Sequence, residues 1–317
     1  MSGAGVGERT SAPWEAGRRF VTSDGTALHV VDTGPRDAEL TTVLLHGWTL
    51  DHTSWDVVAA EVPGRVLRYD HRGHGGSAPA PVGTATIARC ADDLAEVIAD
   101  RVPVGRIVLV GHSMGGMTIM ALAEQHPSLF ERVAGVVLVA TSAGELAGST
   151  LGLPGVVGRA FLAGEKALNR RIARSRRAEL LRRTEVARPG LRWLLFGRRP
   201  SWRHVAATAA MVGRCHPVSM VGFRGSLDEH DRRKALVGLA GVPVVVLAGA
   251  EDRLTPLRHA RVLADEVPHA ELVIYPGAGH MLPLERGREV AGHVVAVARV
   301  SEGEEQKRPR RTGRSAG

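Results

Sequence analysis

The chain has 317 residues, of which 44% are hydrophobic, and a formal net charge of +8. This length suits one large domain or two smaller ones, and no apolar run approaches the roughly 20 residues that a membrane-spanning helix needs. Residues 1–17 lack the apolar stretch of a secretory signal, and Cys90 and Cys215 are too few cysteines for a disulfide framework. We therefore expect a cytoplasmic protein.

The first half of the chain alternates between predicted strands and helices. Residues 19–22 and 27–31 flank an Asp-Gly turn, which predicts an antiparallel hairpin. Short apolar runs then predict buried strands, and apolar residues at helical spacing predict amphipathic helices. The strands are expected at 42–45, 66–69, 107–110 and 133–139, and the helices at 54–60, 87–101 and 114–125.

The alternation stops near residue 141 and resumes near residue 226. The elements expected after the interruption are helices at 230–239, 256–266 and 289–300 and strands at 244–247 and 272–275. Apolar strands alternating with amphipathic helices predict an α/β fold, with a parallel sheet covered on both faces. We expect residues 17–141 and 226–300 to form this core, and residues 1–16 and 301–317 to be flexible tails.

Residues 142–225 are interpreted as a helical cap, inserted at the carboxyl end of a strand, where open α/β sheets bind ligands. One apolar helical face is expected at Val157, Phe161, Leu168 and Ile172. Five larger apolar side chains either line an acyl pocket or form the cap's own core, and these are Trp193, Phe196, Met211, Met220 and Phe223.

The cap is also basic. Residues 143–224 hold sixteen Lys and Arg against four Glu, a net charge of +12, which leaves −4 for the rest of the chain. Such a surface attracts anionic lipid or an acidic substrate, or arginine simply keeps the cap soluble, which is the interpretation we favour. No nucleic-acid partner is expected, because no binding motif accompanies the charge.

A Gly-x-Ser-x-Gly motif, Gly111-His112-Ser113-Met114-Gly115, stands between a predicted strand and a predicted helix. A serine at such a junction lies on a sharp turn that exposes its hydroxyl at the carboxyl end of the strand. The helix N-terminus behind it offers N–H groups to a developing negative charge. The alternative is a glycine-rich helix entry with serine as its N-cap. The motif nominates Ser113 as a nucleophile.

A serine nucleophile needs a base, and the base needs an orienting acid. His280 follows the strand at 272–275 in a glycine-flanked loop, and Asp252 follows the strand at 244–247. Carboxyl ends of parallel strands meet at one edge of a sheet, so Ser113, Asp252 and His280 are expected to converge there. Taken alone, Asp252 is equally well explained as a carboxylate at a helix N-terminus.

Acyl chemistry also requires donors for an oxyanion. We nominate the N–H of Met114, at the start of the helix, and the N–H of Trp48, in the glycine-containing turn His46-Gly47-Trp48. The Trp48 ring has the alternative role of core packing.

These motifs resemble those of the α/β-hydrolase superfamily, over about residues 18–300. The resemblance is carried by His46-Gly47-Trp48, Asp70-His71-Arg72-Gly73-His74-Gly75-Gly76-Ser77, the Ser113 motif, Gly249-Ala250-Glu251-Asp252 and Gly279-His280. It implies an eight-stranded, mostly parallel sheet with a helical cap after the sixth strand, and a Ser-Asp-His triad of Ser113, Asp252 and His280. Members that open epoxides or haloalkanes carry Asp where this chain has Ser113, which disfavours those activities.

Other motifs are weaker. Residues 73–78 fit a dinucleotide-binding pattern, but Pro79 and Pro81 interrupt the helix that this pattern requires. His71 and His74 lack a third metal ligand at suitable spacing, and we expect Asp70 to be structural. The adjacent Cys215 and His216 are interpreted as incidental.

The sequence therefore predicts a serine hydrolase that cleaves a carboxylic ester, esterase- or lipase-like, through an acyl-enzyme, without cofactor or metal. Thioesterase, acyltransferase, C–C-bond hydrolase and cofactor-free perhydrolase activities use the same triad and remain open. A binding protein of this fold that has lost catalysis is a further alternative. The expected partner is a small-molecule ester or thioester, with peripheral contact to anionic lipid through the basic cap left open.

Overall fold

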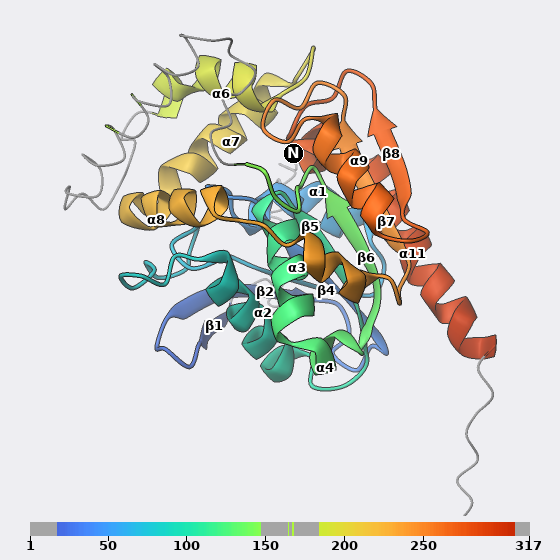
Figure 1. Cartoon of the computed structure of the whole chain (residues 1–317). Helices are drawn as coiled ribbons and strands as arrows, with labels where there is room; N and C mark the ends of the chain where they lie inside the picture. Colours follow the sequence, from blue (N-terminus) through green and yellow to red (C-terminus); the bar gives the residue numbers. More distant parts are fainter. Residues whose placement is uncertain (1–17, 147–163, 165–166, 168–183, 308–317) are drawn as a thin grey trace, which may run out of the picture.

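The computed structural model of the chain describes residues 18–146, 164, 167 and 184–307. Eight strands form one sheet in the order β1-β2-β4-β3-β5-β6-β7-β8 (Figure 1). The strands are β1 (Arg18–Val21), β2 (Ala27–Thr33), β3 (Leu40–Leu45), β4 (Arg65–Tyr69), β5 (Arg106–His112), β6 (Val133–Val139), β7 (Val244–Gly249) and β8 (Glu271–Tyr275).

From β3 onwards, described helices lie between consecutive strands and after the last strand. The α-helices are α1 (Asp56–Glu61), α2 (Ile87–Arg101), α3 (Met114–Gln125), α4 (Pro127–Phe130), α6 (Arg188–Leu195), α7 (Trp202–Arg214), α8 (Pro217–Asp228), α9 (Leu257–Glu266), α10 (Leu282–Glu285) and α11 (Gly287–Lys307). Three 3-10 helices are η1 (His52–Trp55), η2 (Thr184–Ala187) and η3 (Arg233–Leu239).

The sheet is mostly parallel. β1 and β2 pair antiparallel, as do β2 and β4, and the remaining neighbours pair parallel from β4 through β8. Every residue of β6 and β7 is buried, which is typical of parallel strands covered on both faces. The expected eight-stranded, mostly parallel sheet is confirmed.

Helices cover both faces of this sheet (Figure 1). On one face, α1 and α11 pack against β5. The apolar cluster there contains Val110 of β5, Trp55 just before α1, Val58 of α1, and Val290 and Val294 of α11. On the other face, α2, α3 and α9 pack in a larger cluster against the opposite side chains of the same strands. The alternation of side-chain direction along each strand therefore supplies two cores at once.

The structure differs from the sequence-based elements mainly at their ends. α11 continues to Lys307, beyond the expected end at residue 300, because residues 301–307 are rich in the helix-forming residues Glu, Gln and Lys. The segment expected as a helix at 230–239 is the 3-10 helix η3. The two short helices α4 and α10 were not expected.

The insertion begins after β6 and the chain returns to the sheet at β7, which pairs directly with β6. Its described helices are α6, α7 and α8, and residues 184–228, which contain them, are called the cap segment below. The helical face expected at Val157, Phe161, Leu168 and Ile172 lies outside the described residues. Among the helices that the structure describes, none combines the length and apolar character required to cross a membrane.

Candidate active site

Ser113 occupies the junction between β5 and α3 in a strained backbone conformation, with φ 51° and ψ −116°. A non-glycine residue at such a φ is uncommon and costs of the order of 1–3 kcal/mol. The turn is held because the Ser113 N–H donates to the Val139 carbonyl at 2.9 Å and the Thr141 hydroxyl donates to the Ser113 carbonyl at 2.7 Å.

The flanking glycines are required by close backbone packing. A Cβ atom on Gly111 would lie 2.5 Å from the Gly115 carbonyl carbon, and one on Gly115 would lie 2.3 Å from the Leu45 carbonyl oxygen. The two glycines thus let β5, α3 and the end of β3 meet at Ser113, which explains why the motif needs a glycine on each side of it.

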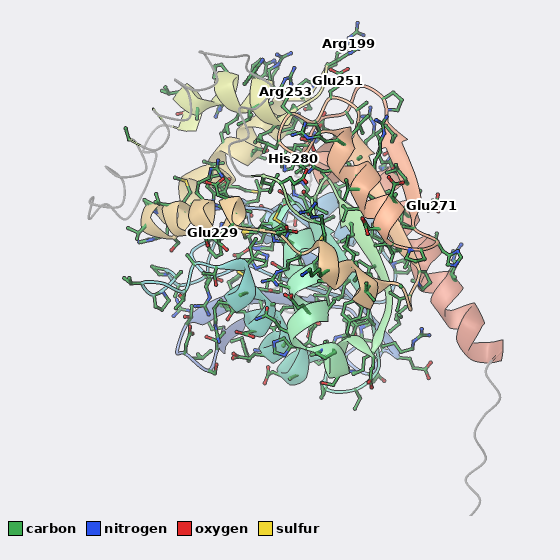
Figure 2. The ribbon with its side chains drawn as sticks, viewed as in Figure 1. Arg199, Glu229, Glu251, Arg253, Glu271 and His280 are labelled. Atoms are coloured by element: carbon green, nitrogen blue, oxygen red, sulfur yellow. The ribbon has the colours of Figure 1, made fainter. Side chains whose placement is uncertain are left out.

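His280 and Asp252 form a buried pair on the loops that follow β8 and β7. His280 Nδ1 lies 2.8 Å from Asp252 Oδ2, and Figure 2 places His280 among the loops at this edge of the sheet. Asp252 also accepts from the N–H of Leu254 and from both the N–H and hydroxyl of Thr255. Burial raises the pKa of Asp252, but the charge and hydrogen bond of His280 and the Thr255 donors outweigh it and lower the pKa overall. Asp252 is therefore ionised at neutral pH.

The backbone of His280 is bound at both ends. Its N–H donates to the Leu195 carbonyl at 2.8 Å, and its carbonyl accepts from His112 Nε2 at 2.9 Å. Because a carbonyl only accepts, His112 carries its proton on Nε2. Burial lowers the pKa of His112 to about 3, so this ring is neutral.

His112 was not assigned a role from the sequence. It is the variable residue before Ser113 in the motif, and its ring lies 4.9 Å from the His280 ring, centroid to centroid. The sequence offered only one signal for His112: a side chain that can form hydrogen bonds occupies this position of the motif. The contact itself joins residues 168 positions apart, so no local pattern reveals it.

The predicted oxyanion residues lie beside Ser113. A Cβ atom on Gly47 would lie 3.2 Å from Ser113 Cβ, which places the turn before Trp48 against the serine. Among the described residues, neither the Trp48 N–H nor the Met114 N–H has a hydrogen-bond acceptor. The half-buried Trp48 ring packs against the core and donates through Nε1 to the Met220 carbonyl at 3.2 Å. The structure thus brings the five predicted site residues to one edge of the sheet.

A second serine–histidine contact lies nearby, between Ser142 Oγ and His259 Nδ1 at 2.9 Å. The Ser142 hydroxyl lies 2.5 Å from the Gly144 carbonyl and donates its proton there. His259 Nδ1 must then be the donor to Ser142, so it cannot accept the serine proton. This pair is arranged as a structural contact.

The motif at residues 70–77 serves the fold. The buried Arg72 guanidinium donates to Asp93 at 2.7 and 2.6 Å and to Asp24 at 2.8 Å. Asp70 accepts from the backbone N–H groups of His52 and Gly76. The expectation that Asp70 is structural agrees with these contacts.

Metal-ligating side chains come together at one place in the part of the chain that the structure describes. The ligand atoms of His29, His52 and Asp70 lie within 4.8 Å of one another. His71 and His74 do not belong to this group; both are fully buried and pack with His46. Asp70 Oδ1 already accepts from His52 Nδ1 at 2.8 Å, so a hydrogen bond accounts for the proximity.

The five apolar cap residues separate into different environments. Phe196 and Met211 belong to an apolar cluster that joins the cap segment to Met281 and Leu284, while Phe223 packs in the main core. Trp193 is 45% exposed and lies under the Arg253 guanidinium, 5.2 Å from its ring centroid. Phe196, Met211 and Phe223 thus agree with the core-packing alternative.

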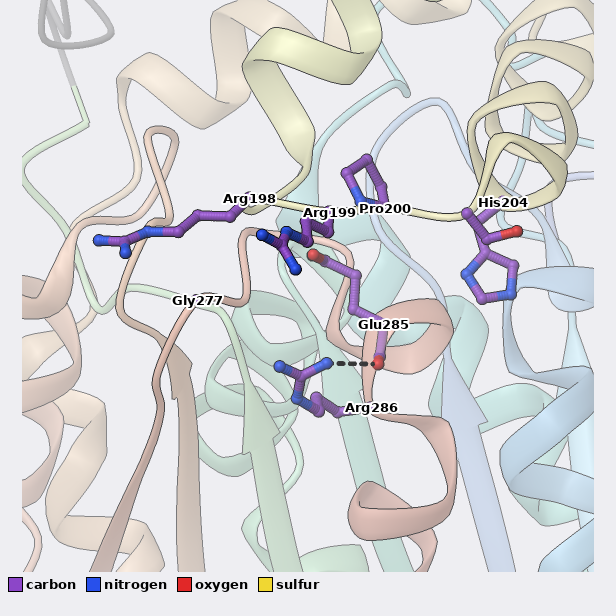
Figure 3. A pocket seen from close by; sticks show the side chains of 8 residues that line it. Arg198, Arg199, Pro200, His204, Gly277, Glu285 and Arg286 are labelled. Atoms are coloured by element: carbon purple, nitrogen blue, oxygen red, sulfur yellow. Dashed lines mark hydrogen bonds between the residues drawn. The ribbon is translucent and has the colours of Figure 1, made fainter.

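A depression of about 570 Å³ lies at the seam between the cap segment and the loop that carries His280 (Figure 3). Its walls carry charged side chains, and its lining residues are Arg198, Arg199, Pro200, Ser201, His204, Gly277, Glu285 and Arg286. Arg198 is already paired with Glu251 at 2.8 Å, and Arg286 lies near Glu289. Much of the positive charge at this seam is therefore locally balanced.

Similar proteins are found by both sequence and structure. The chain is 28% identical to a pimeloyl-[acyl-carrier protein] methyl ester esterase of Nitrosomonas europaea, over 80% of this chain and 92% of that one. It is 29% identical to the dihydrolipoyllysine-residue acetyltransferase component of an acetoin cleaving system of Pseudomonas putida, over 81% of this chain and 63% of that protein. A thermophilic esterase from Thermogutta terrifontis superposes with a TM-score of 0.73 at 25% identity, over 90% of this chain and 98% of the other.

A family model described as the alpha/beta hydrolase fold matches residues 43–287. This range includes the Ser113 turn, Asp252, His280 and the residues of the cap segment. The matched range, the eight-stranded sheet and the esterase-like relatives agree, and the chain belongs to the α/β-hydrolase family.

Proposed function

We propose that this protein is a serine hydrolase that cleaves carboxylic esters through an acyl-enzyme. The observation that carries the proposal is the buried Asp252–His280 pair, joined through His112 to the strained Ser113. Beside Ser113 stand two amides that have no acceptor among the described residues. Ester hydrolysis is the activity in the names of the Nitrosomonas europaea relative and the Thermogutta terrifontis structure.

The first half-reaction forms the acyl-enzyme. Ser113 Oγ bonds to the ester carbonyl carbon while His280 Nε2 takes the serine proton, and the carbonyl electron pair moves onto oxygen. The Trp48 and Met114 amides donate to that oxyanion. The oxyanion then collapses, the C–O bond of the ester breaks, and the leaving alkoxide takes the proton from His280.

The second half-reaction releases the acid. Water attacks the acyl carbon as His280 takes its proton, and Ser113 leaves with that proton returned to Oγ. Asp252 holds the His280 ring in the tautomer that presents Nε2 and stabilises the imidazolium. Each step is a proton or acyl transfer among the side chains of this protein, the ester and water. The proposed substrate is a small-molecule ester or thioester.

Acyl transfer is the second candidate, because one relative is named as an acetyltransferase component. An alcohol or thiol would then replace water in the second half-reaction. A cytoplasmic location is part of the proposal and is supported by Cys90 and Cys215, which are both free and buried.

The test is hydrolysis of a short p-nitrophenyl ester by wild type, Ser113→Ala and Ser142→Ala. Removing the nucleophile of a triad lowers kcat by up to about 10⁶, so Ser113→Ala should lose several orders of magnitude. Ser142→Ala is the matched control, since its serine also contacts a histidine, and it should keep wild-type turnover. Equal rates for Ser113→Ala and wild type would refute the proposal. Adding an alcohol or a thiol and measuring ester exchange against hydrolysis separates transferase from hydrolase.

A further inference from the structure

The cap segment and the loop that carries His280 are joined by backbone hydrogen bonds. The Leu195 carbonyl accepts from the N–H groups of His280 and Met281, at 2.8 and 3.1 Å. In the opposite direction, the Arg198 N–H donates to the Gly277 carbonyl at 3.0 Å. The end of α6 thus runs along the histidine loop and shares its hydrogen bonds, although the two are distant in sequence.

One side chain ties these two segments together. Glu285 Oε2 accepts from the Gly197 N–H and Glu285 Oε1 accepts from the Gly279 N–H, both at 2.9 Å. Gly197 belongs to the cap segment, and Gly279 directly precedes His280. Figure 3 shows Glu285 rising from α10 on the wall of the seam, below residues 198–200.

The packing at the seam leaves little room for movement. A Cβ atom on Gly197 would lie 2.0 Å from the Gly277 carbonyl oxygen. Leu195 and Phe196 share an apolar cluster with Met281 and Leu284, which flank His280 and Glu285 in sequence. A shift of the cap segment therefore pulls directly on the histidine loop.

His280 is consequently held at three points. Its N–H is bound to the cap segment, its carbonyl to His112 and its Nδ1 to Asp252. Among the described residues, its Nε2 has no hydrogen-bond partner, which leaves this nitrogen for the proton transfers proposed above.

We propose that Glu285 is a positioning residue, which fixes the base His280 against the cap by binding the Gly197 and Gly279 amides together. This inference rests on the proposed function. The cap segment and the base His280 then move together, so the position of the cap segment sets the geometry of proton transfer. Burial raises the pKa of Glu285, in keeping with its seam position.

The test compares Glu285→Gln with Glu251→Gln. A glutamine at 285 keeps the size of the side chain but has one acceptor oxygen and one NH2 group, so one of the two glycine amides loses its acceptor. Glu251 is a matched control: its carboxylate also links the cap to the body, but only through the exposed Arg198 side chain. Misplacing a catalytic group by about 1 Å costs on the order of 100-fold.

We expect Glu285→Gln to lower kcat about 10- to 100-fold with KM little changed, and Glu251→Gln to match wild type. The downfield NMR resonance of the His280 Nδ1 proton, which needs no turnover, should shift or broaden in Glu285→Gln alone. A merely structural carboxylate would lower the melting temperature without moving either readout.

A second variant approaches the contact from the other side. Gly197→Ala forces the cap segment away from Gly277 and leaves Glu285 intact, so it should reproduce the loss of kcat if Glu285→Gln does not fold. Wild-type kcat and an unmoved resonance in a folded variant overturn the positioning role. If the wild-type protein hydrolyses the p-nitrophenyl ester no faster than Ser113→Ala, the proposed function is wrong instead.

Discussion

Two buried carboxylates in this molecule, Asp93 and Asp252, each accept hydrogen bonds from a cationic or titratable partner, but the two partners differ in how completely they are hydrogen-bonded. Asp93 receives Arg72 Nε and Nη2, and the remaining Arg72 nitrogen donates to Asp24 and Thr84. Asp252 receives His280 Nδ1 and the donors of Thr255. In the first pair, every guanidinium nitrogen has an acceptor. In the second, the partner keeps one ring nitrogen that has no acceptor among the described residues.

This difference in the hydrogen bonding of the partner indicates where a reactive group is to be expected. A buried charge whose partner is fully hydrogen-bonded can only stabilise, because no proton or lone pair is left to exchange. A buried charge whose partner has an uncommitted nitrogen leaves that nitrogen for the proton transfers proposed above. Burial of a polar group alone therefore does not distinguish a site from a structural network.

Between the two buried pairs, the largest expected effect comes from Asp252→Asn. An asparagine can present an N–H to His280 and so stabilise the wrong tautomer, which lowers kcat about 10⁴-fold in a triad of this kind. Steady-state hydrolysis of a p-nitrophenyl ester measures it, with thermal unfolding as the check on folding. A loss below tenfold would mean that Asp252 does not orient the base.

The opposite outcome is expected for Asp93→Ala. Removing one partner of a buried ion pair costs about 3–5 kcal/mol, so the free energy of unfolding in urea should fall by that order while kcat per folded molecule stays near wild type. Asp92→Ala is the control next to it in sequence, since Asp92 is 36% exposed and pairs with the part-exposed His126. It should cost less than about 1 kcal/mol.

Acid is expected to destabilise the fold through buried histidines. Burial lowers the pKa of His71 to about 3 and that of His74 to about 4, whereas both titrate near 6.5 when unfolded. The unfolded state therefore takes up protons first as pH falls below 6.5. Stability is full above that value and is lost progressively towards pH 3–4, by about 1.4 kcal/mol per pH unit and per histidine.

Urea unfolding between pH 7 and 4 measures this slope. Asp70, whose pKa is lowered to about 2 although burial opposes the shift, loses stability in the same direction. His71→Leu separates the two, because it removes one titrating ring that makes no side-chain hydrogen bond to described residues. A slope unchanged in this variant would show that His71 does not contribute to it.

The smallest effect concerns charges that are not buried. Raising ionic strength from about 0.01 to 0.15 M shortens the Debye length from about 30 to 8 Å, which screens the exposed cap arginines but not the two buried pairs. Hydrolysis of an acidic ester, or of ester in anionic vesicles, should slow a few-fold, and that of a neutral ester should not. Equal salt dependence would leave the arginine excess as surface composition.

The parts of the site that follow from local pattern were predictable. Gly-x-Ser-x-Gly between an apolar strand and a helix specifies the Ser113 turn, and the loops after β7 and β8 point to Asp252 and His280 because parallel strands end at one edge. Glu285 and His112 were not found. Glu285 binds the Gly197 N–H, 88 residues away, as well as the nearby Gly279 N–H, and His112 binds the His280 carbonyl, 168 residues away. Both side chains bind backbone groups, which leave no mark on the sequence.

Among the elements, the central strands β5, β6 and β7 were predictable because the apolar runs at 107–110, 136–139 and 244–247 are unbroken. The end of α11 was missed because charged residues continue a helix as readily as they form a tail. The segment η3 was expected as an ordinary helix because a short apolar-periodic segment suits both forms.

The direct pairing of β6 with β7 bears on how new specificities could be engineered in this scaffold. Val136 and Val244 are neighbours in the sheet, so the insertion leaves and re-enters the sheet at adjacent positions. Chain entropy therefore constrains the length of the insertion only weakly. Chimeras that exchange this insertion with that of a homologue should retain the sheet and the helices on its two faces. We expect these chimeras to be active only if the exchanged segment places a carbonyl at the position of the Leu195 carbonyl, because the His280 N–H otherwise loses its acceptor.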